Sequence, residues 1–329
     1  MSVPVVPADL AVIIVSWNTR DLTLDAIRTV VADLSDTDLD WAIWIVDNAS
    51  TDGTVEAIRT ARFPRLHLIA NPTNLGFARG NNLALRELGF SDDPKPNPTG
   101  PRAVFLLNPD TLTHPGAVRA MFDALMSEPY AGLVGAALTY EDGSFQHSAF
   151  RFPGLIQITV DLFPLPDALR YRLYDSGLNG RYPRKLYASG KPFPVEHTLG
   201  ATMMIRREAI EATGIFDENY FMYVEEIDWS MRIRRAGWEI YVVPTAHITH
   251  LEGRSTRQVR PRSLVNLWTS RFRFYRKFYT PLRAFLARFW VKVGMRLQIG
   301  ALRRAAQRGE MPKEESETLI AAYREILRA

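Results

Sequence analysis

Four short apolar runs recur in the first third of the chain, and each ends in polar residues that precede a helical pattern. The runs are unbroken and rich in Val, Ile and Leu, as in strands that are buried on both faces. The segments between them place apolar residues three and four positions apart, which is typical of amphipathic helices. This alternation predicts a parallel sheet covered by helices on both faces. The predicted strands lie at residues 10–18, 41–51, 66–76 and 103–111, and the helices at 21–34, 52–61 and 77–88.

The periodic pattern weakens in the middle of the chain. Residues 153–195 are rich in Pro, Gly and Tyr and show little periodicity. They predict a long irregular excursion, and loops of that length are often lids or binding loops. Order returns near residue 198. From there the pattern predicts a strand, a helix, a loop, a second helix and a final strand.

All four predicted strands end in polar side chains. In open sheets of parallel strands, ligands bind outside the carboxyl ends of the strands. Turn formation alone explains Asn, Asp and Pro at one such end, but four converging ends favour a binding site. Asp110 follows the break at Pro109, so we expect its carboxylate to face a ligand. The polar residues at the ends are Ser16, Asn18, Asp47, Asn48, Asn71, Asn74, Asn108 and Asp110.

Several enzyme classes lack their motifs here. The first strand is followed by SWNTRD instead of G-x-G-x-x-G, and neither a P-loop nor a G-x-S-x-G elbow occurs in the chain. The chain has no cysteine, so thiolate chemistry and disulfides are excluded. The remaining groups are amides and isolated carboxylates. These can bond a base edge and hold a hard divalent cation on a diphosphate.

Composition indicates an ordinary globular chain of 329 residues, with 47% hydrophobic and 23% charged residues. The first ten residues lack a basic segment, and no run approaches the roughly 18 apolar residues of a membrane-spanning helix. We expect a cytoplasmic protein that associates with the inner face of the plasma membrane.

Charge is distributed unevenly. Residues 254–308 hold 15 Lys and Arg and no Asp or Glu, whereas the whole chain carries only +4. Aromatic residues alternate with these cations. Such a segment suits an anionic membrane surface; binding of single-stranded nucleic acid and packing on the body with solvated charges are the alternatives. We favour the membrane, and expect no nucleic-acid partner.

Five sequence motifs in order resemble the family 2 glycosyltransferases, and in particular the rhamnosyltransferase-type members that build bacterial surface polysaccharides. The motifs are VIIVSWN, VDNASTDGT, NPTNLGFARGNN, FLLNPDT and the stretch from GATMMIRREAIEATGIFDENYF to MYVEEIDWSMRIRRAG. Together they span roughly residues 10–255.

The resemblance implies an α/β GT-A fold, in which a Rossmann-like, mixed and mostly parallel sheet flanked by helices binds a nucleotide sugar. It also implies sugar transfer with inversion and a Mg²⁺ or Mn²⁺ cofactor. The donor is then a dTDP- or UDP-linked sugar, and the acceptor a glycan or a polyprenyl-diphosphate-linked sugar. We expect a glycosyltransferase domain at 1–255, with a nucleotide-sugar-binding half at 1–112 and an acceptor-binding half at 113–255. A basic, aromatic-rich helical appendage follows at 256–329.

The resemblance also assigns roles to residues. Asp110 becomes the metal carboxylate, although Asn108 stands where the family has the first Asp of its Asp-x-Asp motif, and His250 becomes a second metal ligand. Asp110 as a helix cap and His250 as a structural histidine are the alternatives. For Trp17 the alternative is core packing, and for Gly76 and Gly80 it is entry into a helix. The implied donor-binding residues are Ser16, Trp17, Asn18, Asp47, Asn48, Asn74, Gly76, Gly80, Asn81, Asn108 and Asp110.

Three acids, Glu225, Glu226 and Asp228, begin a predicted helix that ends in arginines. Acids at the first turn and bases at the last stabilise a helix through its dipole. Inverting transfer also requires one carboxylate as a base toward the acceptor hydroxyl. By position the resemblance implies Glu226, with Asp228 as the second candidate.

Two other functions remain open at this point. One is a sugar nucleotidyltransferase, but its Gly-rich N-terminal loop with Arg and Lys is missing. The other is a catalytically silent protein that binds sugar nucleotides or serves as a scaffold.

Overall fold

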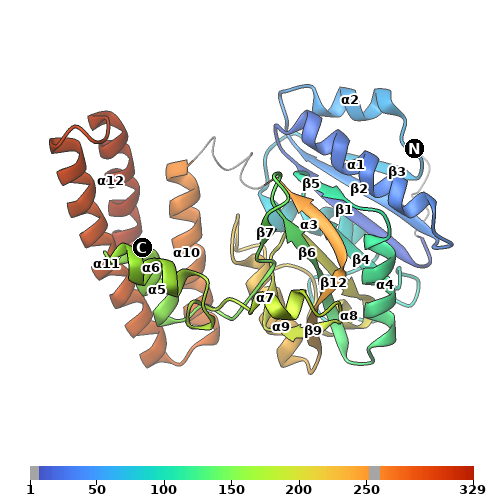
Figure 1. Ribbon diagram of the computed structural model, residues 1–329. Helices are drawn as coiled ribbons and strands as arrows, with labels where there is room; N and C mark the ends of the chain where they lie inside the picture. Colours follow the sequence, from blue (N-terminus) through green and yellow to red (C-terminus); the bar gives the residue numbers. More distant parts are fainter. Residues whose placement is uncertain (1–6, 252–259) are drawn as a thin grey trace. The chain divides into compact units, whose positions relative to one another are not determined.

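The computed structural model describes residues 7–251 and 260–329, which form two compact units (Figure 1). The first unit contains residues up to 150, then 183–221 and 225–255, and the second contains 151–182, 222–224 and 256–329. Residues 254–259 of the basic segment lie outside the described residues.

The first unit is built on a mixed sheet with the strand order β3-β2-β1-β4-β11-β6-β12-β5. Four parallel strands open it: β1 (Leu10–Ser16), β2 (Trp41–Asn48), β3 (Leu66–Asn71) and β4 (Ala103–Leu107). β11 (Thr202–Arg206) runs antiparallel between β4 and β6 (Ala131–Thr139). β12 (Glu239–His250) is parallel to β6 and pairs antiparallel with β5 (Thr111–Thr113) and β9 (Phe193–Val195).

Helices cover both faces of this sheet, which explains why β1, β2 and β4 are apolar throughout. On one face, α1 (Arg20–Ser35) and α4 (Ala117–Ser127) pack on side chains such as Val12, Ile14 and Ile43. On the other face, α3 (Phe77–Glu87) contacts β1 and β2. α2 (Thr54–Ala61) lies against α1. The predicted strands and helices of this half are therefore confirmed.

The rest of the first unit supplies the segment that carries the acidic cluster. α8 (Arg207–Thr213) follows β11, and α9 (Glu225–Arg235) packs against α8, β6 and β12. The short elements β7 (Phe145–Gln146), β8 (Ala149–Phe150), α7 (Arg184–Tyr187) and β10 (His197–Thr198) complete it.

The prediction of an irregular excursion over 153–195 was wrong in part. The segment forms α5 (Leu155–Leu162), α6 (Asp167–Tyr174) and a 3₁₀ turn at Gly177–Asn179, in addition to α7 and β9. α5 is too short for periodicity to reveal it, and it gains its stability from tertiary packing. Trp290 Nε1 donates to Thr159 Oγ1 at 2.8 Å, and the Trp290 and Phe163 rings stack at 4.6 Å.

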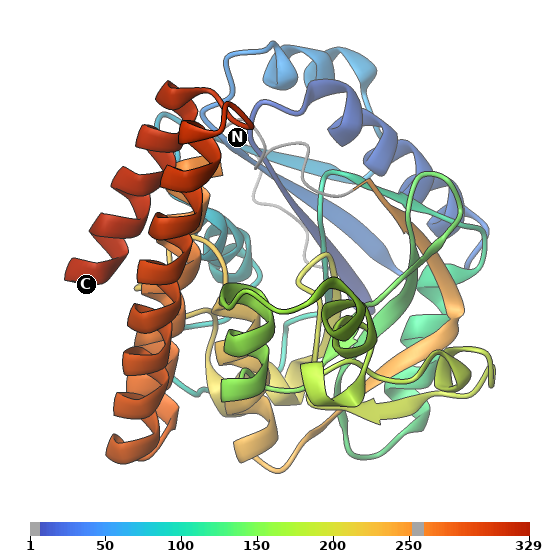
Figure 2. The ribbon, with the colours of Figure 1, turned by 60° about the vertical axis from the view of Figure 1, so that its left-hand side comes forward.

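The second unit is a helical assembly in which α10 (Arg260–Phe278), α11 (Pro281–Gln307) and α12 (Lys313–Arg328) lie side by side, as Figure 2 shows. Thr280 caps α11 through its hydroxyl, and Pro281 occupies the first turn, where its missing N–H costs nothing. The unit also contains residues 151–182, which we assigned to the acceptor-binding half. The division of the chain at 255 therefore stays a prediction.

One tyrosine in the second unit predicts how stability depends on alkaline pH. Tyr275 is buried, its hydroxyl has no hydrogen-bond partner among the described residues, and burial raises its pKa from 10.0 to about 12. Because the unfolded chain ionises first, stability is complete below pH 10.0 and falls toward pH 12, by roughly 1.4 kcal/mol per pH unit for a single group. Tyr275→Phe should leave the thermal midpoint at neutral pH almost unchanged and flatten this alkaline decline. An identical pH profile in the variant would contradict the assignment.

Candidate active site

The loops after β1 and β2 are joined by buried hydrogen bonds around Asp47. Ser16 Oγ donates to Asp47 Oδ2 at 3.1 Å, and the Ser50 N–H donates to Asp47 Oδ1 at 2.9 Å. Asn18 has a left-handed backbone with φ of 50°; its N–H donates to Ser50 Oγ at 2.9 Å, and its side-chain oxygen accepts from the Thr51 N–H at 2.8 Å. Sequence-predicted Ser16, Asn18 and Asp47 therefore lie together at the carboxyl ends of neighbouring strands.

Asn48 links these loops to the loop after β3. Its Oδ1 accepts from Asn71 Nδ2 at 3.0 Å, and its Nδ2 donates to the Gly76 carbonyl at 3.0 Å. Asn74 Oδ1 in turn accepts from the Gly76 N–H at 2.9 Å. Both functional groups of the Asn48 amide are thus engaged within the protein, which fixes the shape of the loop that begins α3.

The two candidate glycines are required by close packing. Gly76 has φ of +82°, and a Cβ atom there would lie 2.2 Å from the Phe221 carbonyl oxygen. A Cβ atom on Gly80 would lie 2.9 Å from a methyl group of Val15 on β1. Packing explains both positions without a ligand. Asn81 is buried and donates to the carbonyl of Phe77 in its own helix at 2.9 Å, and Trp17 is half-buried.

Asp110 and His250 come together although 140 residues separate them in sequence. The pairing of β5 with β12 sets Thr111 opposite His250, and the Leu251 N–H donates to the Asp110 carbonyl at 2.8 Å. As a result, Asp110 Oδ1 lies 3.5 Å from His250 Nε2, and each residue is only 6% exposed. The two metal-ligand candidates therefore face one another.

Sequence reasoning missed Gln146, which orients the histidine. His250 Nδ1 lies 3.3 Å from Gln146 Oε1. The tautomer that donates its Nδ1 proton to that oxygen leaves the lone pair of Nε2 facing Asp110, as metal binding through Nε2 requires. Gln146 lies on the short strand β7, paired with β6, and no sequence motif contains it.

The chemistry of this pair fits Mg²⁺ or Mn²⁺ in combination with a diphosphate. Mg²⁺ is usually bound by one or two carboxylates together with substrate phosphates, and Mn²⁺ also accepts carboxylate, carbonyl and water ligands. Within residues 7–251 and 260–329, no cluster of three or more His, Asp or Glu side chains is suited to a metal ion. Two protein ligands would leave the other coordination positions to a substrate and water.

Of the three acids on α9, Glu226 and Asp228 have contrasting surroundings. Asp228 is fully buried, accepts from Tyr220 OH at 3.2 Å and pairs with Arg232 at 2.8 Å. Arg232 also donates to the carbonyls of Thr213 and Ile215. Glu226 is partly exposed. Asp228 therefore braces the loop before α9, whereas Glu226 is accessible to a substrate.

Glu226 lies beside the strand end that carries Asp110. Its side chain lies next to Gly200, where a Cβ atom would be 3.4 Å from Glu226 Cγ. The next residue, Ala201, accepts from the Asn108 N–H at 3.0 Å. Two short contacts thus connect the acidic cluster to the NPD motif at the end of β4.

The backbone is strained just before the acidic cluster. Tyr223 and Val224 have φ of 69° and 73°, and positive φ is rare for residues other than glycine and rarest for a β-branched one. Such conformations are concentrated at functional sites.

A second residue missed by sequence reasoning, Asn82, joins α3 to the loop that leads to α9. It is fully buried, accepts from the Phe216 N–H at 3.1 Å and donates to the Phe216 carbonyl at 2.9 Å. Glu218 on the same loop pairs with Arg86 at 2.7 Å. Asn is a poor helix former, so its place inside α3 was a signal of a tertiary role.

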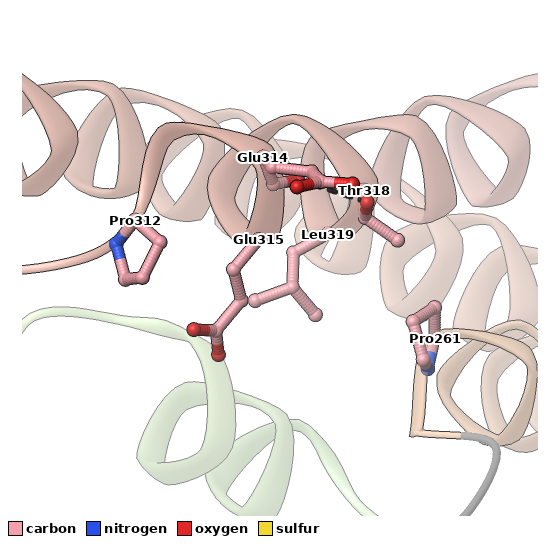
Figure 3. Close-up of a pocket in the computed structure, with 6 residues that line it drawn as sticks. All are labelled: Pro261, Pro312, Glu314, Glu315, Thr318 and Leu319. Carbon is pink, nitrogen blue, oxygen red and sulfur yellow. Dashed lines mark hydrogen bonds between the residues drawn. The ribbon is translucent and has the colours of Figure 1, made fainter.

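Hollows in the two units differ in chemistry. In the first unit a hollow of about 400 Å³ begins at Asn18 and continues to Asp52 along the first turn of α1. In the second unit a hollow of about 410 Å³ lies between Pro261 and the start of α12 (Figure 3). The charged side chains that line the latter are Glu314 and Glu315. A further hollow of about 570 Å³ in the second unit is lined by Arg303, Lys313, Arg324 and Glu317, whereas Arg20, Asp21 and Asp52 line the one in the first unit. The hollow of the first unit is a candidate for a nucleotide because it lies beside the strand ends, where ligands of parallel sheets bind.

The fold and these residues define a transferase of the GT-A architecture. Residues 11–214 match Glycosyl transferase family 2, and the chain belongs to that family. The predicted α/β GT-A fold class with helices after the sheet is confirmed.

Similar proteins support the resemblance to the rhamnosyltransferase-type members of the family. The chain is 32% identical to the N-acetylglucosaminyl-diphospho-decaprenol L-rhamnosyltransferase of Mycobacterium tuberculosis over 221 residues, which is 65% of this chain and 68% of that protein. It is 27% identical to the low-salt glycan biosynthesis hexosyltransferase Agl10 of Haloferax volcanii over 58% of this chain and 52% of that protein. The chain is thus a rhamnosyltransferase-like member of the family.

A solved structure supports the fold. The mannosyltransferase PcManGT from Pyrobaculum calidifontis, in complex with GDP-Man and Mn²⁺, matches with a TM-score of 0.55 and 17% identity. The match covers 99% of this chain and 88% of that one.

Proposed function

We propose that this glycosyltransferase moves a sugar, with rhamnose as the favoured one, from a nucleoside diphosphate to a hydroxyl of a surface-glycan or polyprenyl-diphosphate-linked acceptor, with inversion. Support for the acceptor comes from the Mycobacterium tuberculosis relative, whose name specifies a diphospho-decaprenol-linked N-acetylglucosamine and transfer of L-rhamnose. dTDP and UDP are the nucleotides proposed for the donor.

One observation carries the proposal: the contacts that connect Glu226, through Gly200 and Ala201, to the strand end bearing Asp110. Inverting transfer needs a base on the acceptor side of the sugar and charge compensation on the diphosphate side. A partly exposed carboxylate, linked by these contacts to the loop that carries Asp110, would supply the base, and the buried Asp–His pair would supply the charge compensation.

In the proposed reaction, the Glu226 carboxylate takes the proton of the acceptor hydroxyl as that oxygen bonds to the anomeric carbon. The bond from the anomeric carbon to the donor phosphate oxygen breaks at the same time, and its electron pair leaves with the nucleoside diphosphate. Asp228, bonded to Tyr220 and Arg232, fixes the first turn of α9 and thereby keeps the Glu226 carboxylate directed toward the acceptor hydroxyl.

The strand ends form the proposed donor site. Asp47 and Asn48 would contact the base and ribose, while Ser16, Trp17, Asn18, Asn74, Gly76, Gly80 and Asn81 line the site, and Asn108 and Asp110 lie toward the diphosphate. Asp110 and His250 would hold Mg²⁺ or Mn²⁺, which when bound neutralises charge on the leaving diphosphate.

We also propose that the protein works in the cytoplasm at an anionic membrane surface, through residues 254–308, and not on nucleic acid. No helix within the described part of the chain has the length and apolar character needed to cross a bilayer. Attachment would then be peripheral, by the basic helices of the second unit.

A thermal-shift screen followed by a transfer assay tests the function. Any ligand that binds only the native state raises the midpoint, by an amount equivalent to about 2.7 kcal/mol at a hundredfold excess over Kd. We expect dTDP or UDP to stabilise the protein more with Mn²⁺ than without it. The dTDP- or UDP-sugar should then yield free nucleoside diphosphate and a product of inverted anomeric configuration when an acceptor is added.

The same experiment separates the alternatives. Nucleotide binding with no sugar transfer to any lipid-linked acceptor would favour the silent binding protein. Release of pyrophosphate from a nucleoside triphosphate and a sugar phosphate would favour the nucleotidyltransferase.

A further inference from the structure

We propose that one face of α11, formed by Leu282, Phe285, Leu286 and Phe289, inserts into the headgroup region of an anionic bilayer. The inference rests on the proposed action at a membrane surface and specifies the inserting residues. The positions are spaced by three, one and three residues, so at 3.6 residues per turn the side chains project from one face of the helix. This set is called the α11 stripe below.

Exposure of the stripe is unusual for side chains of this size. Leu282 is 68% exposed, Phe285 65%, Leu286 42% and Phe289 52%, while the opposite face of α11 buries Ala287, Val291 and Met295. Scattered single apolar residues on a surface need no explanation, but a contiguous set indicates an interaction site.

Cations flank the stripe and identify its partner. Arg283 lies within it in sequence, and Arg276 precedes it at the end of α10; both are exposed, and neither forms an ion pair with any residue in the described ranges. Lys292 follows on α11 outside the apolar arc, whereas Arg288 donates to the Ala329 carbonyl at 2.9 Å and lies over the ring of Phe272. An apolar face between cations matches the layered chemistry of an anionic membrane surface, acyl chains beneath negative headgroups.

A second copy of the chain is a poorer partner. An interface between two such stripes would bring the same arginines close to one another, because residues 254–308 carry no Asp or Glu to compensate them. The phosphates of single-stranded nucleic acid could pair with the cations. Leu282 and Leu286 would gain no contact of their own, however, since base stacking requires aromatic rings.

Site-specific labelling tests the insertion directly, because the chain contains no native cysteine. A polarity-sensitive fluorophore is attached to Phe285→Cys in the full chain. Its emission should shift to the blue and increase in intensity when vesicles of phosphatidylglycerol and phosphatidylcholine are added. Spin-labelled acyl chains should quench it. The matched control is Thr318→Cys on α12, an exposed position outside the stripe, whose fluorophore should respond little.

Partitioning to the same vesicles gives the energetic test. The double variant Phe285→Ser and Phe289→Ser should bind roughly a hundredfold more weakly. Each phenyl group contributes about tenfold, because insertion into the headgroup region removes only part of its surface from water. Arg276→Gln and Arg283→Gln should each weaken binding about fivefold, and only on anionic vesicles. An unchanged thermal midpoint confirms that the variants are folded.

The proposed insertion would be overturned if the double serine variant bound vesicles as tightly as the wild type. It would also be overturned if the emission of the label at position 285 shifted to the blue without vesicles and the shift grew with protein concentration, as self-association predicts. A change in label emission with single-stranded DNA but not with lipid would overturn it as well. Failure of the enzyme proposal is distinguished by a transfer assay on a lipid-free acceptor analogue. Insertion without transfer to any acceptor would refute only that proposal, and transfer without insertion only this one.

Discussion

Replacing Glu226 by Gln is expected to lower the turnover number by roughly 10²–10⁴, the range found when a general base is removed. The amide keeps the size of the side chain and its hydrogen bonding but cannot accept the proton of the acceptor hydroxyl. Glu226 is partly exposed and lies against Gly200, so neither core packing nor the helix should suffer. Turnover is measured at saturating donor and acceptor, and donor affinity is measured separately by thermal shift. We expect that affinity to stay near the wild-type value.

Asp228→Asn is the matched control on the same helix. Its carboxylate is fully buried and pairs with Arg232, so the substitution leaves the half-buried guanidinium of Arg232 without its counter-charge. Breaking such a pair is strongly destabilising, at several kcal/mol. We therefore expect a lower thermal midpoint and a loss of turnover per folded molecule that is milder than the loss in Glu226→Gln. Full activity in Glu226→Gln together with a folded but inactive Asp228→Asn would move the base two residues along the helix.

The acidic cluster illustrates what sequence alone could not decide. Glu226 and Asp228 have the same charge, lie on the same first turn and satisfy the same dipole preference. They differ in what surrounds them. Arg232, four residues along the same helix, pairs with Asp228, and Tyr220 from the preceding loop donates to it. The pair with Arg232 follows from helix periodicity, whereas burial of Asp228 and its contact with Tyr220 depend on the fold. Local pattern identified the cluster, whereas the roles proposed for its members depend on burial.

Strand ends were predictable for a different reason. β1, β2 and β4 are buried on both faces, so their apolar runs stop where the sheet stops, and polar residues such as Asp47 and Asn108 mark those places. The resulting convergence of loops follows from parallel pairing alone. The sequence therefore predicted the four parallel strands and where each begins, although every observed strand ends two to five residues before its predicted end.

Residues with long-range partners were missed. Gln146 contacts His250 across 104 positions, and Asn82 contacts Phe216 across 134. Gln146 belongs to no periodic pattern or motif, and the NPTNLGFARGNN motif, which ends at Asn82, gives that residue no partner. A polar side chain has no preferred partner until the strands are paired. α5 was missed for a related reason, since its eight residues are stabilised by α11 and not by their own helix propensity.

Asp110→Ala should abolish the Mn²⁺-dependent part of nucleoside diphosphate binding and lower transfer by roughly 10²–10³, the rate equivalent of several kcal/mol of charge stabilisation at the leaving diphosphate. The fold should survive, because the contact that fixes the register of β5 and β12 uses the Asp110 carbonyl and not its side chain. Thermal shifts with dTDP or UDP, with and without Mn²⁺, give the binding result. Mn²⁺ binding followed by electron paramagnetic resonance gives it without any turnover.

Two variants bracket this result. Asp93→Asn, which alters an exposed carboxylate in the connection between α3 and β4, should retain wild-type Mn²⁺ dependence. His250→Ala should weaken Mn²⁺ binding less than Asp110→Ala, because the retained carboxylate is the harder ligand and carries the formal charge. The proposed metal site would be refuted if Asp110→Ala bound Mn²⁺ and nucleoside diphosphate as tightly as the wild type. If Asp93→Asn lost as much Mn²⁺ binding as Asp110→Ala, the effect would be due to the overall charge of the protein surface and not to a specific metal site.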